Sequence, residues 1–319
     1  MNIVGLITEY NPFHNGHLYH IQEAKRVTGA DAAVVIMSGN FVQRGTPAIM
    51  PKHLRVKAAL LSGADLVLEL PVCFATGSAE FFSMGSVALL DSLGCIDSIC
   101  FGSECGDSKT LGKIARILAE EPGDYKNVLQ DALRKGVSFP QARQTALTQY
   151  FDMPSTDPDR ISSVNAKTVA AILSQPNNIL GIEYMKALYK RNSSMKAYSI
   201  KRIGAGYHES ELTESYSSAS AIRRALIQDS LSESIYRQLP SAAQNIMKEA
   251  FGTRYPVYAN DFSLLLKYKL LQETKETLTN YMDISEDLAN RIINLRNDFQ
   301  SFDGLCDALK TKDMTYARI

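Results

Sequence analysis

Two histidines lie where a predicted strand gives way to a predicted helix. His14 and His17 are separated by Asn15 and Gly16, and they follow the apolar run 3–7. From Gly16 onward apolar residues recur with a helical period, so the pair lies at a helix N-terminus. Backbone N–H groups at such a junction are expected to be unpaired, and the helix dipole favours an anion there. The sequence therefore predicts a phosphate site.

The spacing of the histidines suits a nucleoside triphosphate. Two imidazoles can donate hydrogen bonds to phosphate oxygens as pyrophosphate departs, and one such donor is worth about 10²–10³ in rate. Gly16 is expected to let the phosphate approach the backbone. A metal site built from His14, His17 and His20 with Glu23, or an ordinary loop, are the alternatives, although helical geometry places His20 off the face of His14. The pattern resembles the HxGH signature of the nucleotidyltransferase superfamily.

Composition limits the class of protein. The chain of 319 residues exceeds a typical single domain, and its formal net charge of zero neither demands nor excludes a nucleic-acid partner. Five cysteines without a C-x-x-C pair indicate reduced thiols. The chain begins directly with a strand, and no apolar run approaches membrane-spanning length. We therefore expect a cytoplasmic protein without a membrane partner, and we predict no protein partner.

The elements that must position the histidines alternate along the first part of the chain. Strands are predicted at 3–7, 30–37, 65–70, 96–101 and 195–203. Helices are predicted from Gly16 onward, at 51–61 and at 78–93. Strands that alternate with helices imply right-handed βαβ units and a parallel, Rossmann-like α/β sheet.

Two other parts of the chain contain only helical patterns. Between the fourth and fifth strands, helices are predicted at 108–119, 122–135, 138–151, 165–174 and 179–191. We accordingly predict an ATP-binding α/β domain (1–106 and 193–230), a helical insertion (107–192) and a helical C-terminal domain (231–319). Residues 310–319 end without a helix cap, so that last domain is expected to be shortened.

Apolar residues with helical spacing give the expected core. In the helix at 78–93, the core residues are predicted to be Phe81, Phe82, Val87, Leu89 and Leu90. In the C-terminal domain, most of the following are predicted to be buried: Phe262, Leu264, Leu265, Tyr268, Leu270 and Leu271.

Several further residues lie at the expected carboxyl ends of strands, where ligands bind in open parallel sheets. Gln43 and Arg44 follow the second strand, and Arg44 could pair with a carboxylate or phosphate or form a structural salt bridge. Gly102 follows the fourth strand and would let a base or ribose approach the backbone. Asn177 and Asn178 begin a helix, either as N-caps or as nucleotide ligands, and the sequence leaves both open.

A second group of polar residues begins a helix near residue 218. Hydroxyls of Ser218 and Ser220 in a first turn, with Arg223 beyond them, can bind phosphate together. A serine-rich helix cap is the alternative. The stretch resembles the superfamily's second signature, ISSTxIR, although Ser217 replaces its leading Ile and Ala219 its second Ser. Two motifs in the right order at opposite ends of one domain strengthen each other.

The strings GLITEYNPFHNGH, MSGNFVQRG, PNNILGIEY and IKRIGAGYH resemble the bacterial tRNA(Met) cytidine acetate ligase family over nearly the whole chain. The resemblance implies a two-step reaction. Acetate attacks the α-phosphate of ATP to give acetyl-adenylate and pyrophosphate, and the N4 amine of the wobble cytidine of elongator tRNA(Met) then takes the acetyl group. Mg²⁺ is expected to share the charge of the triphosphate.

From the two motifs we expect His14, His17 and Arg223 to be catalytic and Ser218 and Ser220 to contact the phosphates. Gln43 and Arg44 are our candidates for the acetate side. The family resemblance implies that the ATP contacts come from Ile7, Thr8, Glu9, Tyr10, Asn11, Pro12, Phe13, His14, Asn15, Gly16, His17, Leu18, Tyr19, His20, Gly102, Asn177 or Asn178, and Arg202. The family usually continues past a TYARI-like string with further helix thought to help hold tRNA.

Two other functions are compatible with these motifs. One is an adenylyltransferase that joins AMP to a phosphate-bearing precursor and so forms a nucleotide cofactor. The other is a non-catalytic relative that only binds a nucleotide or tRNA. Because His14, Gly16 and His17 are all present, the sequence favours an enzyme.

Overall fold

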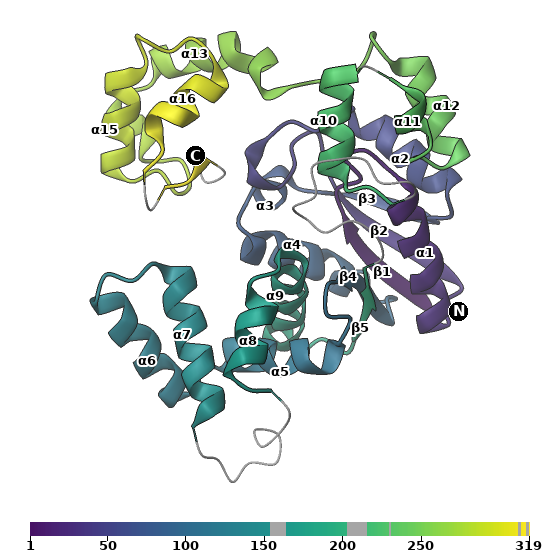
Figure 1. Cartoon of the computed structure of the whole chain (residues 1–319), viewed down its shortest axis with the longest axis vertical. Coiled ribbons are helices and arrows are strands. Elements are labelled where there is room, and N and C mark those ends of the chain that lie inside the picture. Colours follow the sequence, from purple (N-terminus) through teal and green to yellow (C-terminus); the bar gives the residue numbers. More distant parts are fainter. Residues whose placement is uncertain (154–163, 203–215, 230, 312–313, 317–318) are drawn as a thin grey trace.

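Within the described residues, five parallel strands form one sheet in the order β3–β2–β1–β4–β5 (Figure 1). The computed structural model describes residues 1–153, 164–202, 216–229, 231–311, 314–316 and 319. The strands are β1 (Ile3–Thr8), β2 (Ala32–Ser38), β3 (Leu66–Leu70), β4 (Ser98–Ser103) and β5 (Lys196–Lys201). All neighbouring pairs are parallel, so the predicted Rossmann-like fold is confirmed.

The strand order positions the site. β1 pairs with β2 on one side and with β4 on the other. The chain therefore reverses its direction of travel across the sheet between β1 and β4, and ligands of open α/β sheets bind beyond the carboxyl ends of the strands at such a point. The loop that carries His14 follows β1, and Gly102 lies within the last residues of β4.

Alternate residues of the strands face two separate cores. Ile3 and Ile36 belong to one cluster of buried side chains, whereas Val4 and Val35 belong to the other. This alternation follows from the two-residue period of a strand. Both faces of the sheet are thus buried under helices, as the parallel arrangement requires.

The helices on the two faces come from different parts of the sequence (Figure 1). One face is covered by α1 (Asn15–Thr28), α2 (Lys52–Leu61), α10 (Ala219–Asp229), α11 (Glu233–Tyr236) and α12 (Ser241–Ala250). The other is covered by α3 (Val72–Ala75), α4 (Ala79–Ser92), α5 (Ser108–Glu120) and α9 (Pro176–Arg191). The predicted insertion therefore supplies two of the helices that bury the sheet.

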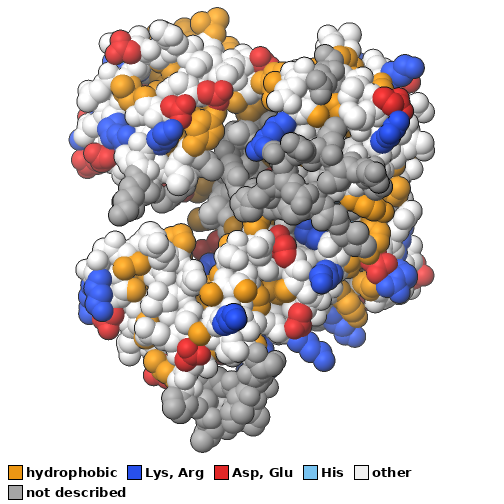
Figure 2. Space-filling view, viewed as in Figure 1, with side chains coloured by type: hydrophobic (Ala, Val, Ile, Leu, Met, Phe, Trp, Pro, Cys, Tyr) orange, Lys and Arg blue, Asp and Glu red, His pale blue; other side chains and the backbone are white. Residues whose placement is uncertain are grey.

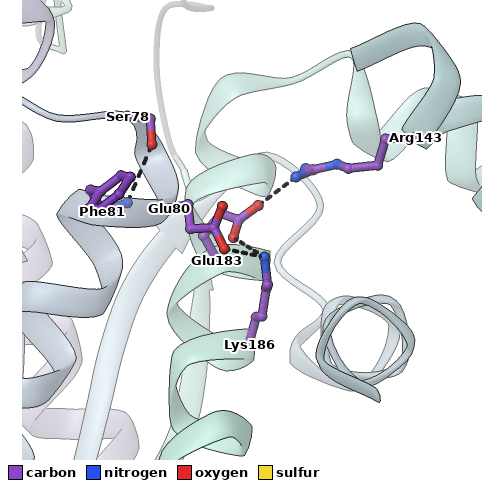
Figure 3. A network of polar contacts seen from close by, with 6 residues as sticks. All are labelled: Ser78, Glu80, Phe81, Arg143, Glu183 and Lys186. Atoms are coloured by element: carbon purple, nitrogen blue, oxygen red, sulfur yellow. Dashed lines mark hydrogen bonds and ion pairs between the residues drawn. The ribbon is translucent and has the colours of Figure 1, made fainter. Parts of the chain in front are cut away.

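A buried charge network fixes α9 to its neighbours (Figure 3). The carboxylate of Glu183 is almost fully buried and accepts a hydrogen bond of 2.6 Å from Nη1 of Arg143. Lys186 lies 3.4 Å from the same carboxylate and 2.7 Å from that of Glu80. Two cations thus compensate one buried anion, which burial alone would make costly. The network joins α4, α9 and α7 (Phe139–Asp152), the second helix of a pair that extends from the sheet.

That extended part contains the remaining helices of the insertion, α6 (Gly123–Arg134), α7 (Phe139–Asp152) and α8 (Ala166–Leu173). The C-terminal part contains η2 (Ala259–Phe262), α13 (Ser263–Gln272), α14 (Lys275–Leu278), α15 (Glu286–Leu295) and α16 (Phe302–Leu309). It has a hydrophobic cluster of its own, separate from both clusters of the sheet. Because α11 and α12 pack into the cluster of the sheet instead, the region 231–319 contains two packing units. The domain boundaries stay predictions.

Two core predictions were wrong. In α13 only Leu270 is buried, whereas Leu264 is 79% exposed and Leu265, Tyr268 and Leu271 are at least half exposed. This helix is apolar around most of its circumference, but the small C-terminal unit buries a single face of it. Phe81, predicted to be core, is 40% exposed in α4.

Two features of the described residues are the length of their helices and the distribution of their surface charge. None of their helices combines the length and apolar composition needed to cross a bilayer. On the face in Figure 2, lysine and arginine side chains lie apart from one another and are interspersed with acidic side chains.

The buried side chain of Arg55 joins the segments at the carboxyl ends of β1 and β2. Arg55, in α2, is 1% exposed. Its guanidinium donates to the carbonyl oxygens of Ser38 (3.2 Å), Met50 (3.1 Å), Glu9 and Gly39. These carbonyls belong to the chain that follows β1 and β2. Burial lowers the pKa of Arg55 to about 10, so the guanidinium stays charged at neutral pH.

We predict that Arg55→Met lowers the free energy of unfolding by about 3 kcal/mol or more, because each carbonyl left buried without a donor costs about 1–3 kcal/mol. Urea unfolding measures the change. Arg134→Met is the matched control. Arg134 is exposed and forms a surface ion pair of 3.5 Å with Asp131, so its replacement should change stability by less than about 1 kcal/mol. Equal losses in the two variants would contradict the role given to Arg55.

Candidate active site

The two histidines cap the N-terminus of α1 reciprocally. His14 is the N-cap residue, and its Nδ1 accepts a hydrogen bond of 3.0 Å from the N–H of Gly16. The N–H of His14 donates in turn to Nδ1 of His17 at 3.3 Å. The two rings stack with centroids 3.8 Å apart. The histidines thus take the positions that Ser and Glu occupy in an ordinary capping box.

This arrangement fixes the tautomer of both rings. A neutral imidazole has one donor and one acceptor nitrogen, so a ring whose Nδ1 accepts carries its proton on Nε2. Burial, with the nearby cations Arg202 and Arg223, lowers the pKa of His14 to about 3. Burial, followed by unfavourable electrostatic interactions with His14 and Arg202, also lowers the pKa of His17 well below its usual value. Each ring is therefore a neutral Nε2–H donor at physiological pH.

The expectation of unpaired backbone donors was wrong. The N–H of Asn15 donates to the carbonyl of Gln238 at 2.9 Å, that of His17 donates to the carbonyl of His14 at 2.9 Å, and that of Gly16 is taken by the His14 ring. A Cβ on Gly16 would lie 2.9 Å from Cε1 of His14. Gly16 is thus needed for the ring to fold over its N–H. The predicted phosphate binding would therefore depend on the Nε2–H groups and the helix dipole.

Aromatic side chains hold the His17 ring from the other side. The rings of Tyr10 and His17 meet edge-on with centroids 4.8 Å apart, and Phe13 contacts both at 4.8 and 5.6 Å. Tyr10 and Phe13 are fully buried. Both therefore pack against the His17 ring and fix its position, and their contacts with ATP stay predictions.

The second motif is brought beside the first. Oγ of Ser218 accepts from the N–H of Ala221 at 3.1 Å and lies 2.9 Å from Oγ of Ser220. Nη1 of Arg223 donates to the carbonyl of Asn11 at 2.6 Å. The first turn of α10 thus adjoins the loop between β1 and α1, as the order of the motifs predicted. Ser218 is also a helix cap, so the two interpretations of this serine are compatible.

The end of β4 and the residue after β5 lie on the remaining side. The N–H of Arg202 donates to the carbonyl of Ser103 at 3.0 Å. A Cβ on Gly102 would lie 3.3 Å from Cγ of Arg202, so the glycine makes room for that side chain. Burial and the charge of Arg202 lower the pKa of His20 to about 4. Nε2 of His20 is buried and has no hydrogen-bond partner in the described part of the chain.

The two asparagines lie in the first turn of α9, and neither is its N-cap. The carboxylate of Glu104 accepts from Nδ2 of Asn177 at 2.7 Å and from the N–H of Asn178 at 2.8 Å. The Asn178 side chain is buried and bonds the backbone of Cys105 and Ile172. The Asn178 side chain thus bonds the protein through both its oxygen and its nitrogen, and that of Asn177 through its nitrogen. Which of the two contacts the nucleotide stays a prediction.

Glu9 and Asn11, candidates from the loop after β1, bond the loop after β2. Oε1 of Glu9 accepts from the N–H of Gln43 at 2.9 Å, and Oδ1 of Asn11 accepts from the N–H of Ile49 at 2.8 Å. Gln43 begins a short 3₁₀ turn, η1 (Gln43–Gly45). The side chain of Arg44 lies outside the described residues, so both interpretations of it stay predictions. Contacts from the following residues also stay predictions: Ile7, Thr8, Pro12, Leu18 and Tyr19.

Three residues were missed by reasoning from sequence: Arg55, Glu104 and Gln238. Each acts through contacts with segments distant in the chain, for which a single sequence carries no local signal. For Arg55, the sequence showed only an arginine within a predicted helix, and its burial became evident from the structure.

Comparison with known proteins agrees with this geometry. A family model described as HIGH Nucleotidyl Transferase matches residues 1–319. The chain belongs to the HIGH nucleotidyltransferase family. This nucleotidyltransferase is 42% identical to a tRNA(Met) cytidine acetate ligase of Acetivibrio thermocellus, over 100% of this chain and 75% of the relative. A protein of the same name from Clostridium novyi is 44% identical over 100% of this chain and 76% of that protein.

Solved structures match the nucleotidyltransferase throughout. The crystal structure of apo TmcAL from Thermotoga maritima has a TM-score of 0.91 at 36% identity and covers 100% of this chain and 73% of that chain. The same protein bound with alpha-thio ATP has a TM-score of 0.89 at 36% identity, over 100% and 72%. The resemblance predicted from the motifs is confirmed.

We predict that two roles of His14 can be separated by substitution: the helix cap made by Nδ1, and the hydrogen bond that Nε2–H would donate to the nucleotide. His14→Asn keeps an acceptor at the position of Nδ1 but lacks the Nε2–H group, so it should fold with little loss and turn over about 10²–10³ more slowly. His14→Gln places its amide near Nε2 and loses the cap, which costs about 1 kcal/mol of stability. Unfolding curves and ATP turnover on both variants measure the split. A fully active His14→Asn enzyme would exclude the donor role.

The buried histidines also predict a dependence of stability on pH. The unfolded protein binds protons at these rings below about pH 6.5, whereas folded His14 stays neutral down to about pH 3. The free energy of unfolding should therefore fall with pH below 6.5, by about 1.4 kcal/mol per pH unit for His14 alone. Urea titrations at pH 7.5 and 5.5 test this. His14→Asn should reduce the slope, because asparagine binds no proton in this pH range.

Proposed function

We propose that this protein activates acetate with ATP and transfers the acetyl group to N4 of the wobble cytidine of elongator tRNA(Met). The observation that carries the proposal is the pair of neutral Nε2–H donors on His14 and His17 beside the hydroxyls and guanidinium of α10. Relatives at 42% and 44% identity bear the name tRNA(Met) cytidine acetate ligase. A structural neighbour was solved with alpha-thio ATP.

The first step forms one bond to phosphorus and breaks another. A carboxylate oxygen of acetate attacks the α-phosphorus of ATP, and the bond from that phosphorus to the bridging oxygen breaks. Pyrophosphate leaves with the electron pair. Charge then grows on the departing oxygens, where His14, His17 and Arg223 would donate hydrogen bonds, with Ser218 and Ser220 from the first turn of α10.

The second step transfers the acetyl group. The cytidine N4 amine attacks the carbonyl carbon of acetyl-adenylate, AMP leaves, and N4 loses a proton. Arg202, Gly102 and Asn177 would hold the adenosine part at the carboxyl end of β4. Gln43 and Arg44 would lie on the acetate side, where a small loop-closed pocket would exclude larger acids.

Mg²⁺ would enter as its ATP complex and neutralise charge on the triphosphate. The side chains gathered at the motifs donate through nitrogen and hydroxyl groups, a set that suits phosphate oxygens. Mg²⁺ itself prefers phosphate oxygens, carboxylates and water. We therefore assign the cation to the nucleotide and derive no step from a protein-bound metal. Because the acceptor is a tRNA, we place the protein in the cytoplasm.

The test is pyrophosphate release from ATP and Mg²⁺ with and without acetate, followed by mass spectrometry of cytidine from added tRNA. We expect acetate-dependent release and N4-acetylcytidine in tRNA(Met). His17→Ala is the negative control, since it removes one Nε2–H donor and should lower the rate by about 10²-fold or more.

Other outcomes identify the rival functions. Release that needs a phosphorylated precursor and ignores acetate would make the protein a cofactor-forming adenylyltransferase. ATP that binds and stays intact with acetate and tRNA would make it a binding protein. Release from His17→Ala at the wild-type rate would remove the histidine pair from the mechanism.

A further inference from the structure

One residue outside both motifs bonds the starts of the two helices that carry them. Gln238 lies between α11 and α12 and is 2% exposed. Its carbonyl oxygen accepts from the N–H of Asn15, the first residue of α1, at 2.9 Å. Its side-chain Oε1 accepts from the N–H of Ser217 at 2.9 Å, directly before Ser218 and the first turn of α10. One residue therefore spans the N-termini of α1 and α10.

The fold holds Gln238 firmly in this position. Its neighbours Ile235 and Leu239 are buried in the same cluster as α1 and α10. The N–H of Gln238 donates to the carbonyl of Ile235 at 3.0 Å. The side chain of Asn15 strengthens the link, since its Nδ2 donates to the carbonyl of Arg237 at 2.8 Å. The variable position of the HxGH motif is thus used to bind this turn.

In the proposed function the two motifs contact one triphosphate from different sides, so the distance between them affects nucleotide binding and the reaction rate. Two hydrogen-bonded links join them within the described residues. Nη1 of Arg223 donates directly to the carbonyl of Asn11, and Gln238 bridges Asn15 and Ser217. If Ser217 lost its acceptor, its buried N–H would have to move to find another, and α10 begins two residues later. A displacement of about 1 Å can cost 10²-fold in rate.

We propose that Gln238 is a positioning residue that sets the distance between the two phosphate-binding helix N-termini. It does so through Oε1 toward Ser217 and through its backbone toward Asn15. The inference rests on the proposed function in one respect, namely that both motifs contact the same nucleotide. It assigns Gln238 no contact with substrate.

Gln238→Met tests the side-chain arm of the bridge. Methionine has a similar volume and keeps the backbone bond to Asn15, but it cannot accept from Ser217. Gln238→Glu retains an Oε1 acceptor and serves as the rescue. Gln244→Met is the matched control, because Gln244 lies on α12 of the same unit and bonds the carbonyls of Tyr236 and Leu239, away from both helix starts.

Two readouts are measured on the intact protein, alongside thermal unfolding. Titration calorimetry with alpha-thio ATP gives nucleotide affinity, and pyrophosphate release gives kcat and KM. We expect Gln238→Met to bind the analogue about tenfold more weakly and to lose about tenfold in kcat. Gln238→Glu should recover to within about threefold of wild type. Gln244→Met should match Gln238→Met in thermal stability while it keeps wild-type affinity and kcat.

The outcomes separate the inference from the proposed function. Wild-type affinity and kcat in Gln238→Met, or equal losses in Gln244→Met, would reduce Gln238 to a structural role and overturn the inference. If wild type binds alpha-thio ATP without acetate-dependent turnover, the proposed function fails while the affinities still decide about Gln238. If Gln238→Met does not fold, Gln238→Asn replaces it, since its amide is one methylene too short for Ser217 and the same losses are expected.

Discussion

The site depends on neutral imidazoles that serve as helix caps. A serine or aspartate at the N-cap of α1 would accept from the same backbone N–H group, but it would offer no second donor on its opposite side. His14 and His17 use Nδ1 for the cap and keep Nε2–H as a second, opposite donor. Protonation of either ring would turn its Nδ1 into a donor that faces another donor. The fold therefore enforces neutrality through burial and through the nearby arginines, which lower the pKa of His14.

The surrounding contacts preserve this geometry on three sides. Arg55 binds the carbonyls that follow β1 and β2, so the loop before His14 is anchored by a buried charge. Glu104 caps α9 from the end of β4 and holds Asn177 at the same edge. Gln238 bonds the start of α1 to the start of α10. Each contact joins segments that are separated along the chain, so three residues position several loops.

Local patterns predicted most of the fold because they report local physics. The runs at 3–7 and 30–37 became β1 and β2, and the five helices predicted between the fourth and fifth strands all formed with boundaries shifted by a few residues. The same patterns failed where burial depends on partners. Leu264 and Leu265 belong to an apolar helix that has too little protein around it to be covered.

The candidate site was predictable in its residue types but not in its bonding. The sequence placed His14, His17 and Arg223 together through two motifs. It could not show that first-turn N–H groups were already occupied, because one of their acceptors, Gln238, lies more than two hundred residues away. For the same reason the sequence could not distinguish Asn177 from Asn178, whose side chain bonds the backbone of Cys105 and Ile172.

The parts of the site are synthesised at different times, because they lie far apart in the sequence. Asn15 and Arg237 are 222 residues apart, and Asn11 and Arg223 are 212 residues apart. Contacts of such sequence separation form late, because the intervening chain must first be ordered. A nascent chain can therefore build β1, α1 and their histidine cap long before α10 and Gln238 leave the ribosome. The two motifs come together only after the strands between them have joined the sheet, so a nucleotide that contacts both, as we propose, could bind only once this domain has folded.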